Sequence, residues 1–189
     1  MNLLFIGDVV GQSGCDFLES RMYKLKREYD IDVTVVNGEN SAQGNGITPQ
    51  SYRQLLNMGA DVVTTGNHSF RRREAEELYD TNEQLLRPAN YPEGVMGHGV
   101  TYIDMCPYKI AVVNLMGTMY MEAVENPFNY VDKLLESIDT PNIIVDFHAE
   151  ATSEKKAMGF YLQKRCTAVL GTHTHVQTAD ETILGGHTA

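Results

Sequence analysis

Short apolar runs, most of them followed directly by polar residues, recur along this chain of 189 residues and constrain its fold more than any other feature. Their lengths predict buried strands at residues 3–6, 33–36, 60–65, 110–115, 143–147 and 168–170. Segments with helical spacing lie between them, at residues 17–29, from residue 49 onward, at 128–138 and at 157–164. A chain that alternates strands with helices in this way is typical of an α/β fold.

Residues 85–104 do not follow this alternation. Pro88, Pro92 and Gly94 interrupt the segment, so it predicts short extended pieces and a hairpin rather than a helix.

Length and composition predict one globular domain over residues 1–189. Hydrophobic residues make up 42% of the chain and charged residues 21%, an ordinary balance for a globular protein. No apolar run approaches the ~20 residues of a membrane-spanning helix, so we expect no membrane partner. The formal net charge of −10 disfavours tight nonspecific binding to DNA or RNA, whose phosphates it would repel.

The cysteines and the N-terminus indicate the compartment. Cys15, Cys106 and Cys166 are odd in number and widely spaced, which disfavours a disulfide framework or a zinc–thiolate site. We expect all three to be small buried hydrophobes. The first residues lack the basic region of a signal peptide, so we expect a cytoplasmic protein.

Polar side chains that can bind metal ions lie at the carboxyl ends of five predicted strands. They are Asp8, Glu39, Asn40, Asn67, His68, His148, His173 and His175. In open α/β sheets, ligands bind outside the carboxyl ends of the strands, so this shared position predicts one functional site. Imidazole, carboxylate and amide groups suit divalent first-row metals, and two such ions ~3.5–4 Å apart can clamp a phosphoryl group.

Each of these residues also has an ordinary structural interpretation. Asp8 can cap a helix, residues 37–40 can form a plain turn, and His148 can be a hydrogen-bonded core histidine. The pair His173-x-His175 after Gly171 is the most specific signal. Five such strand ends together favour a metal site over caps and core residues.

Two other features carry less information. Residues 41–46, SAQGNG, contain glycine but have neither the lysine of a P-loop nor Rossmann spacing, so we interpret them as a mobile loop near the site. Arg71, Arg72 and Arg73 could bind a phosphate, but a solvated helix face is the favoured interpretation.

Several motifs together resemble the YmdB-like branch of the calcineurin-like metallophosphoesterases. They are GDVVG at 7–11, NGEN at 37–40, GNH at 66–68, LLRPANYP at 85–92, FHAE at 147–150 and GTHTHVQTAD at 171–180. The resemblance implies a four-layer αββα sandwich and a binuclear centre of iron or manganese, with zinc or cobalt as alternatives. It places Asp8, Glu39, Asn40 and His175 on one ion and Glu39, Asn67, His148 and His173 on the other, with Glu39 bridging.

The resemblance also implies a phosphodiesterase that acts on small diesters such as cyclic nucleotides. A metal-bridging hydroxide would attack phosphorus, and His68 would protonate the leaving alkoxide as general acid. The alternatives are a phosphomonoesterase or nucleotidase, a non-catalytic metal-binding interaction protein, and an amidohydrolase barrel, for which 189 residues is short.

Members of this branch continue well past the position where this sequence ends. We therefore expect the C-terminal strands to be truncated and one sheet edge to be uncovered, which would favour a homo-oligomer. The acidic surface favours a small substrate, with RNA ends as an alternative.

Overall fold

The computed structural model describes all residues from Met1 to Ala189 and divides into two compact units. The N-terminal unit comprises Met1–Arg87 and Met96–His98, and the C-terminal unit comprises Pro88–Val95 and Gly99–Ala189. Each unit has one four-stranded sheet with helices, so the predicted α/β class is confirmed, with two sheets and five α-helices. None of these helices combines the length and the hydropathy that crossing a bilayer requires.

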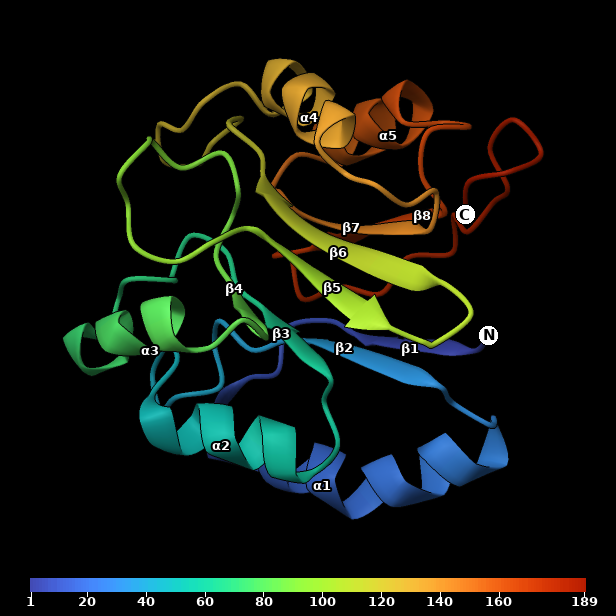
Figure 1. Cartoon of the computed structure of the whole chain (residues 1–189). Helices are drawn as coiled ribbons and strands as arrows, with labels where there is room; N and C mark the ends of the chain where they lie inside the picture. Colours follow the sequence, from blue (N-terminus) through green and yellow to red (C-terminus); the bar gives the residue numbers. More distant parts are fainter. The chain divides into compact units, whose positions relative to one another are not determined.

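The N-terminal unit has a parallel sheet in the order β1-β2-β3-β4, with α1 and α2 along one face (Figure 1). Its strands are β1 (Leu3–Ile6), β2 (Val33–Asn37), β3 (Val62–Thr64) and β4 (Leu85–Leu86). Its helices are α1 (Gly11–Glu28), α2 (Pro49–Asn57), the 3-10 turn η1 (Arg73–Ala75) and α3 (Glu76–Thr81).

Local sequence explains the best-defined elements of this unit. Every residue of β2 is buried, as its continuous apolar run predicts for a central parallel strand. Helix α2 begins after Thr48, whose hydroxyl accepts from the backbone N–H of Ser51 in a capping box, with Pro49 in the first turn. Leu55 of α2 and Met22 of α1 are buried in the core that lines the sheet.

The C-terminal unit has a mixed sheet in the order β5-β6-β7-β8, covered on one face by α4 and α5 (Figure 1). Its strands are β5 (Val100–Asp104), β6 (Lys109–Met116), β7 (Ile143–His148) and β8 (Ala168–Thr172), and its helices are α4 (Pro127–Glu136) and α5 (Thr152–Tyr161). Strands β5 and β6 form an antiparallel hairpin, whereas β6, β7 and β8 are parallel.

The irregular segment and the last helix differ in detail from the predictions. Residues 85–104 contain the short strands β4 and β5, as the predicted extended pieces, but no hairpin forms within the segment, because β4 pairs with β3 and β5 pairs with β6. Helix α5 begins five residues before the predicted start at 157 and ends at Tyr161 rather than at 164. The earlier end has a backbone reason, since Lys164 takes a φ of 66°, which no helix accommodates.

The strand register aligns the carboxyl ends of β6, β7 and β8 at one end of the C-terminal sheet. Met116 pairs with His148, and His148 pairs with Thr172. The last residue of the sequence lies along the other side of β8, where Val169 donates to the carbonyl of Ala189, whose own N–H donates to Thr167. Residues 167–169 of this edge are therefore paired with the last residue.

The cysteines differ from one another, and the prediction of three buried thiols is wrong for Cys106. Cys106 is exposed in the turn between β5 and β6, whereas Cys15 and Cys166 are buried. Burial raises the pKa of Cys166 to about 11, and burial with the nearby charges of Asp16 and Glu19 raises the pKa of Cys15.

We expect an aromatic disulfide reagent at neutral pH to titrate one thiol rapidly in the native protein and all three after denaturation. Only a thiolate reacts, and the raised pKa values keep the buried thiols protonated. Absorbance of the released thiolate measures this. The variant Cys106→Ser should remove the rapid phase, and a rapid phase that survives this change would contradict the placement.

Candidate functional site

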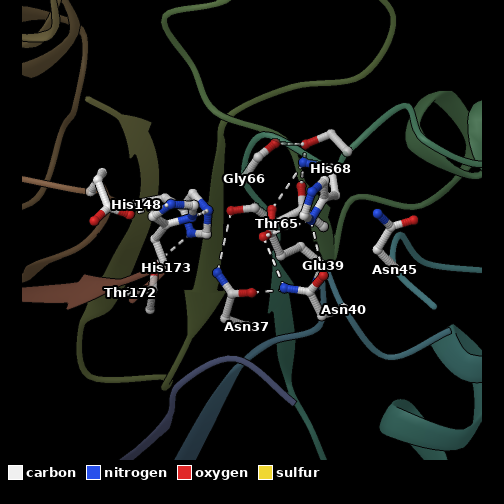
Figure 2. Close-up of polar contacts among 12 residues, drawn as sticks. Asn37, Glu39, Asn40, Asn45, Thr65, Gly66, His68, His148, Thr172 and His173 are labelled. Atoms are coloured by element: carbon white, nitrogen blue, oxygen red, sulfur yellow. Dashed lines mark hydrogen bonds and ion pairs between the residues drawn. The ribbon is translucent and has the colours of Figure 1, made fainter. Parts of the chain in front are cut away.

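A buried carboxylate lies at the carboxyl end of β2. Glu39 is fully buried, and its Oε1 accepts from the Asn40 side-chain amide at 3.0 Å. Its Oε2 accepts from the backbone N–H of His68 at 3.1 Å (Figure 2). A buried ionised carboxylate is costly unless hydrogen bonds or cations compensate it, so this position favours a bound cation.

The ring of His68 lies beside the same two residues. Its Nδ1 is 2.9 Å from Asn40 Oδ1 and 3.2 Å from Glu39 Oε1 (Figure 2). Both oxygens are acceptors, because the amide nitrogen of Asn40 points at Glu39. Nδ1 must therefore carry a proton, and Nε2 is the ring nitrogen that can exchange a proton with another molecule. The His68 side chain is 27% exposed, which allows that exchange.

Asp8 and Asn67 occupy the neighbouring strand ends of this unit. Two backbone hydrogen bonds flank Asp8 and tie its loop to the end of β2: Val9 donates to Asn37 at 3.0 Å, and Gly11 donates to Asn40 at 2.8 Å. Asn67 lies in the turn after β3, directly before His68. The structure thus brings the segments that carry Asp8, Glu39, Asn40, Asn67 and His68 to the same end of β1–β3, as the sequence predicted.

The loop at 41–46 is attached to the segment that follows His68. The Arg72 guanidinium donates to the carbonyl of Asn45 at 2.8 Å and also to that of Gln43. The interpretation of Arg72 as part of a solvated helix face is therefore wrong. Arg72 instead attaches the loop that follows Asn40 to the segment that contains His68.

The C-terminal unit contributes a second group, at the carboxyl ends of β7 and β8. His148 is fully buried, and its Nδ1 is 2.9 Å from Thr172 Oγ1 (Figure 2). The Thr172 hydroxyl donates its only proton to Asp146 Oδ1 at 2.7 Å, so it can only accept from His148. Nδ1 of His148 therefore carries the proton, and its Nε2 presents a lone pair.

The ring of His173 is oriented with Nε2 toward a carboxylate and Nδ1 toward His148. Its Nε2 lies 2.9 Å from Glu150 Oε2, which leaves Nδ1 to face His148 Nε2 at 3.1 Å. Two nitrogen ligands with bonds of about 2.1 Å at right angles on one metal ion would be about 3.0 Å apart, so this spacing fits adjacent ligands of a single ion. Carboxylates and hydroxyls that orient ligand histidines through the other ring nitrogen are the usual surroundings of metal sites.

The backbone of the histidine loop is strained. His173 has a φ of 98° and His175 a φ of 53°, values that non-glycine residues rarely adopt. Strain of this kind persists where the surrounding structure enforces it, and it clusters at functional sites. His175 is exposed in the same loop, two residues after His173.

The C-terminal unit offers imidazole nitrogens, and the N-terminal unit offers carboxylate and amide oxygens. Both kinds of donor suit iron, manganese, zinc or cobalt.

The chain matches the sequence profile of the YmdB-like protein family over residues 4–189. The chain belongs to this family.

Individual relatives agree with this assignment. The YmdB-like chain is 47% identical, over its whole length, to a 2',3'-cyclic-nucleotide 2'-phosphodiesterase of Bacillus subtilis and spans 72% of that protein. Its fold matches a crystal structure of a hypothetical protein from Thermus thermophilus with a TM-score of 0.94 at 40% identity, covering 100% of this chain and 73% of the other. A phosphatase structure from Mycoplasma pneumoniae matches with a TM-score of 0.93 at 32% identity, covering 98% and 69%.

Sequence reasoning missed the residues that orient the histidines of this YmdB-like chain. Asp146 lies inside the apolar run 143–147, and its charge within a buried strand was the available signal. Thr172 adjoins the predicted ligand His173, and Glu150 lies two residues after His148, but nothing in their spacing shows which histidine they contact.

We expect Thr172→Val to weaken metal binding about 10–100-fold while the fold is kept. The change removes the hydroxyl that fixes the ring of His148, and loss of such a partner typically has this effect. A competition titration with a chelating dye measures the affinity. Thr101→Val makes the same change at a buried site on β5 and should leave the affinity unaltered. Equal affinities in the two variants would contradict the role.

Proposed function

We propose that this chain is a metal-dependent phosphodiesterase that hydrolyses small diesters such as 2',3'-cyclic nucleotides. The Bacillus subtilis relative, 47% identical over the whole chain, is a 2',3'-cyclic-nucleotide 2'-phosphodiesterase, which supports the reaction and the substrate class. The observation that carries the proposal is the orientation of the histidines. The hydrogen bonds turn Nε2 of His148 and Nδ1 of His173 toward each other, where a metal ion could bind, and they place the proton of His68 on Nδ1, so that Nε2 can meet a substrate.

The proposed metal ligands are Asp8, Glu39, Asn40, Asn67, His148, His173 and His175. When bound, two cations would generate a nucleophile from water at neutral pH and stabilise negative charge on the phosphoryl oxygens. Iron or manganese is the proposed metal, and the nitrogen and oxygen donors also suit zinc or cobalt.

His68 is the proposed general acid. Asn40 Oδ1 and Glu39 Oε1 hold its Nδ1–H, so the ring cannot rotate away from its position. In the proposed reaction the Nε2–H of the ring is delivered to a leaving alkoxide. An alkyl diester such as a cyclic nucleotide needs this proton, because its alkoxide is a poor leaving group. An activated ester with a phenolate leaving group needs it less.

The net charge of −10 favours a small substrate over long RNA, with RNA ends as the alternative. The cytoplasmic location and a homo-oligomer stay predictions.

The test compares substrates on one metal-loaded preparation. Protein reconstituted with Mn²⁺ or Fe²⁺ and then desalted should hydrolyse 2',3'-cyclic AMP and an aryl diester faster than the matching aryl monoester. The Mycoplasma pneumoniae phosphatase structure makes a phosphomonoesterase the second candidate, and a faster monoester reaction would favour it. Two tightly held metals without turnover of either substrate would contradict both.

A further inference from the structure

The loop that leaves β6 forms a tight turn with an aromatic residue at its tip. Met121 donates its backbone N–H to the carbonyl of Thr118, which closes a four-residue turn. Tyr120 is the third residue of this turn and has a φ of 63°. Glycine is the preferred residue at such a position, since a side chain there is strained. A tyrosine held in this conformation indicates that its side chain has a use.

Both ends of the turn are anchored. Glu154 of α5 accepts from the backbone N–H of Thr118 at 2.9 Å, from its hydroxyl at 3.1 Å and from the N–H of Met119 at 3.3 Å. On the other side, Met121 packs against the core of the C-terminal unit. The turn therefore presents Tyr120 from a fixed base.

The base of this turn is joined to one of the proposed metal ligands. Gly117 donates its N–H to the carbonyl of His148 at 2.9 Å. A Cβ at Gly117 would lie 2.7 Å from the Cβ of Ala149, so glycine permits the close approach of the two strands. Three residues of chain span at most about 11 Å, which keeps Tyr120 within a nucleotide's length of this strand end.

The ring of Tyr120 is open to solvent. It is 86% exposed, more than any other large hydrophobic side chain of the protein. Arginines lie over the exposed rings of Phe17, Tyr23 and Tyr161, whereas none lies over Tyr120 or over several other exposed rings. Its faces are available to a flat ligand.

We propose that Tyr120 is a specificity-determining residue that stacks against the base of a nucleotide substrate. The inference rests on the proposed phosphodiesterase function. Every base has a π-face, so a single aromatic platform would favour nucleotides over diesters without a base and would discriminate little between bases. A platform that is already rigid loses little conformational entropy on binding.

The experiment compares two cyclic diesters that differ only in the base. One is 2',3'-cyclic AMP, and the other is the 2',3'-cyclic phosphate of methyl riboside, which has no base. We expect Tyr120→Ala to raise KM for 2',3'-cyclic AMP roughly tenfold with little change in kcat, because one stacked base contributes binding of this order. KM for the base-free diester should change less than about twofold, and Tyr120→Phe should restore the wild-type KM.

The control is Tyr102→Ala. Tyr102 is 45% exposed on β5 and pairs with Ala111, five residues before Met116 along β6. At 3.3 Å per residue, Tyr102 lies roughly 16 Å along the sheet from the carboxyl end of β7, where His148 lies. Both KM values should therefore be unchanged.

The outcomes separate this inference from the proposed function. If wild-type protein hydrolyses neither diester, the proposed function fails. If it hydrolyses both and Tyr120→Ala raises the two KM values equally, or Tyr120→Phe does not restore binding, the stacking role of Tyr120 is overturned while the function stands.

Discussion

His68→Ala is expected to lower kcat on 2',3'-cyclic AMP about 10²–10⁴-fold, the usual contribution of a positioned general acid. On a bis(p-nitrophenyl) diester the loss should stay below about tenfold, because p-nitrophenolate leaves without a proton. The imidazole is the only part removed, and the backbone N–H of His68 can still donate to Glu39 Oε2. Metal content and Tm should therefore be close to those of the wild type.

Steady-state kinetics on the two diesters, with metal content measured on the same samples, tests this expectation. His98→Ala is the matched control, since His98 lies in the same unit and its ring Nε2 lies 3.0 Å from the carbonyl of Glu83. Equal losses on both substrates would mean that His68 does not protonate the leaving group. Loss of bound metal would show that its role is to support Glu39 and Asn40.

Glu39→Gln is expected to remove most of the bound metal, from about two ions per chain to less than one, and to abolish turnover. Glutamine keeps the volume and one oxygen acceptor at this fully buried position but lacks the charge that would bridge two cations. In metal-free protein Tm should change little, because the loss of a buried charge is offset by an amide NH2 that faces one of the two donors to Glu39.

Elemental analysis after reconstitution and desalting measures the metal, and thermal unfolding of both apo proteins measures the fold. Glu74→Gln removes an exposed carboxylate from η1 of the same unit and should keep both ions. A Glu39→Gln protein that retains two ions would contradict the bridging role. A large fall in apo Tm would show instead that the carboxylate stabilises the fold by itself.

Much of the fold could be predicted from local sequence. The apolar run before Asn37 predicts a buried strand, and β2 is buried throughout. Thr48 and Pro49 predict the start of α2, and their capping interactions are present. These features follow from chain periodicity and from contacts within a few residues. The end of α5 was missed because a positive φ at Lys164 has no signature in a lysine.

The candidate site was predicted as a set of strand ends, because parallel strands place their carboxyl ends at one edge of a sheet. The sequence alone therefore predicted a set of candidate metal ligands. Only the tertiary structure decided which partners orient their side chains. Thr172 and Asp146 orient His148 from 24 and two residues away, and Asn40 orients His68 from 28 residues away. Such contacts depend on strand register and side-chain direction, which the spacing of residues along the chain does not specify.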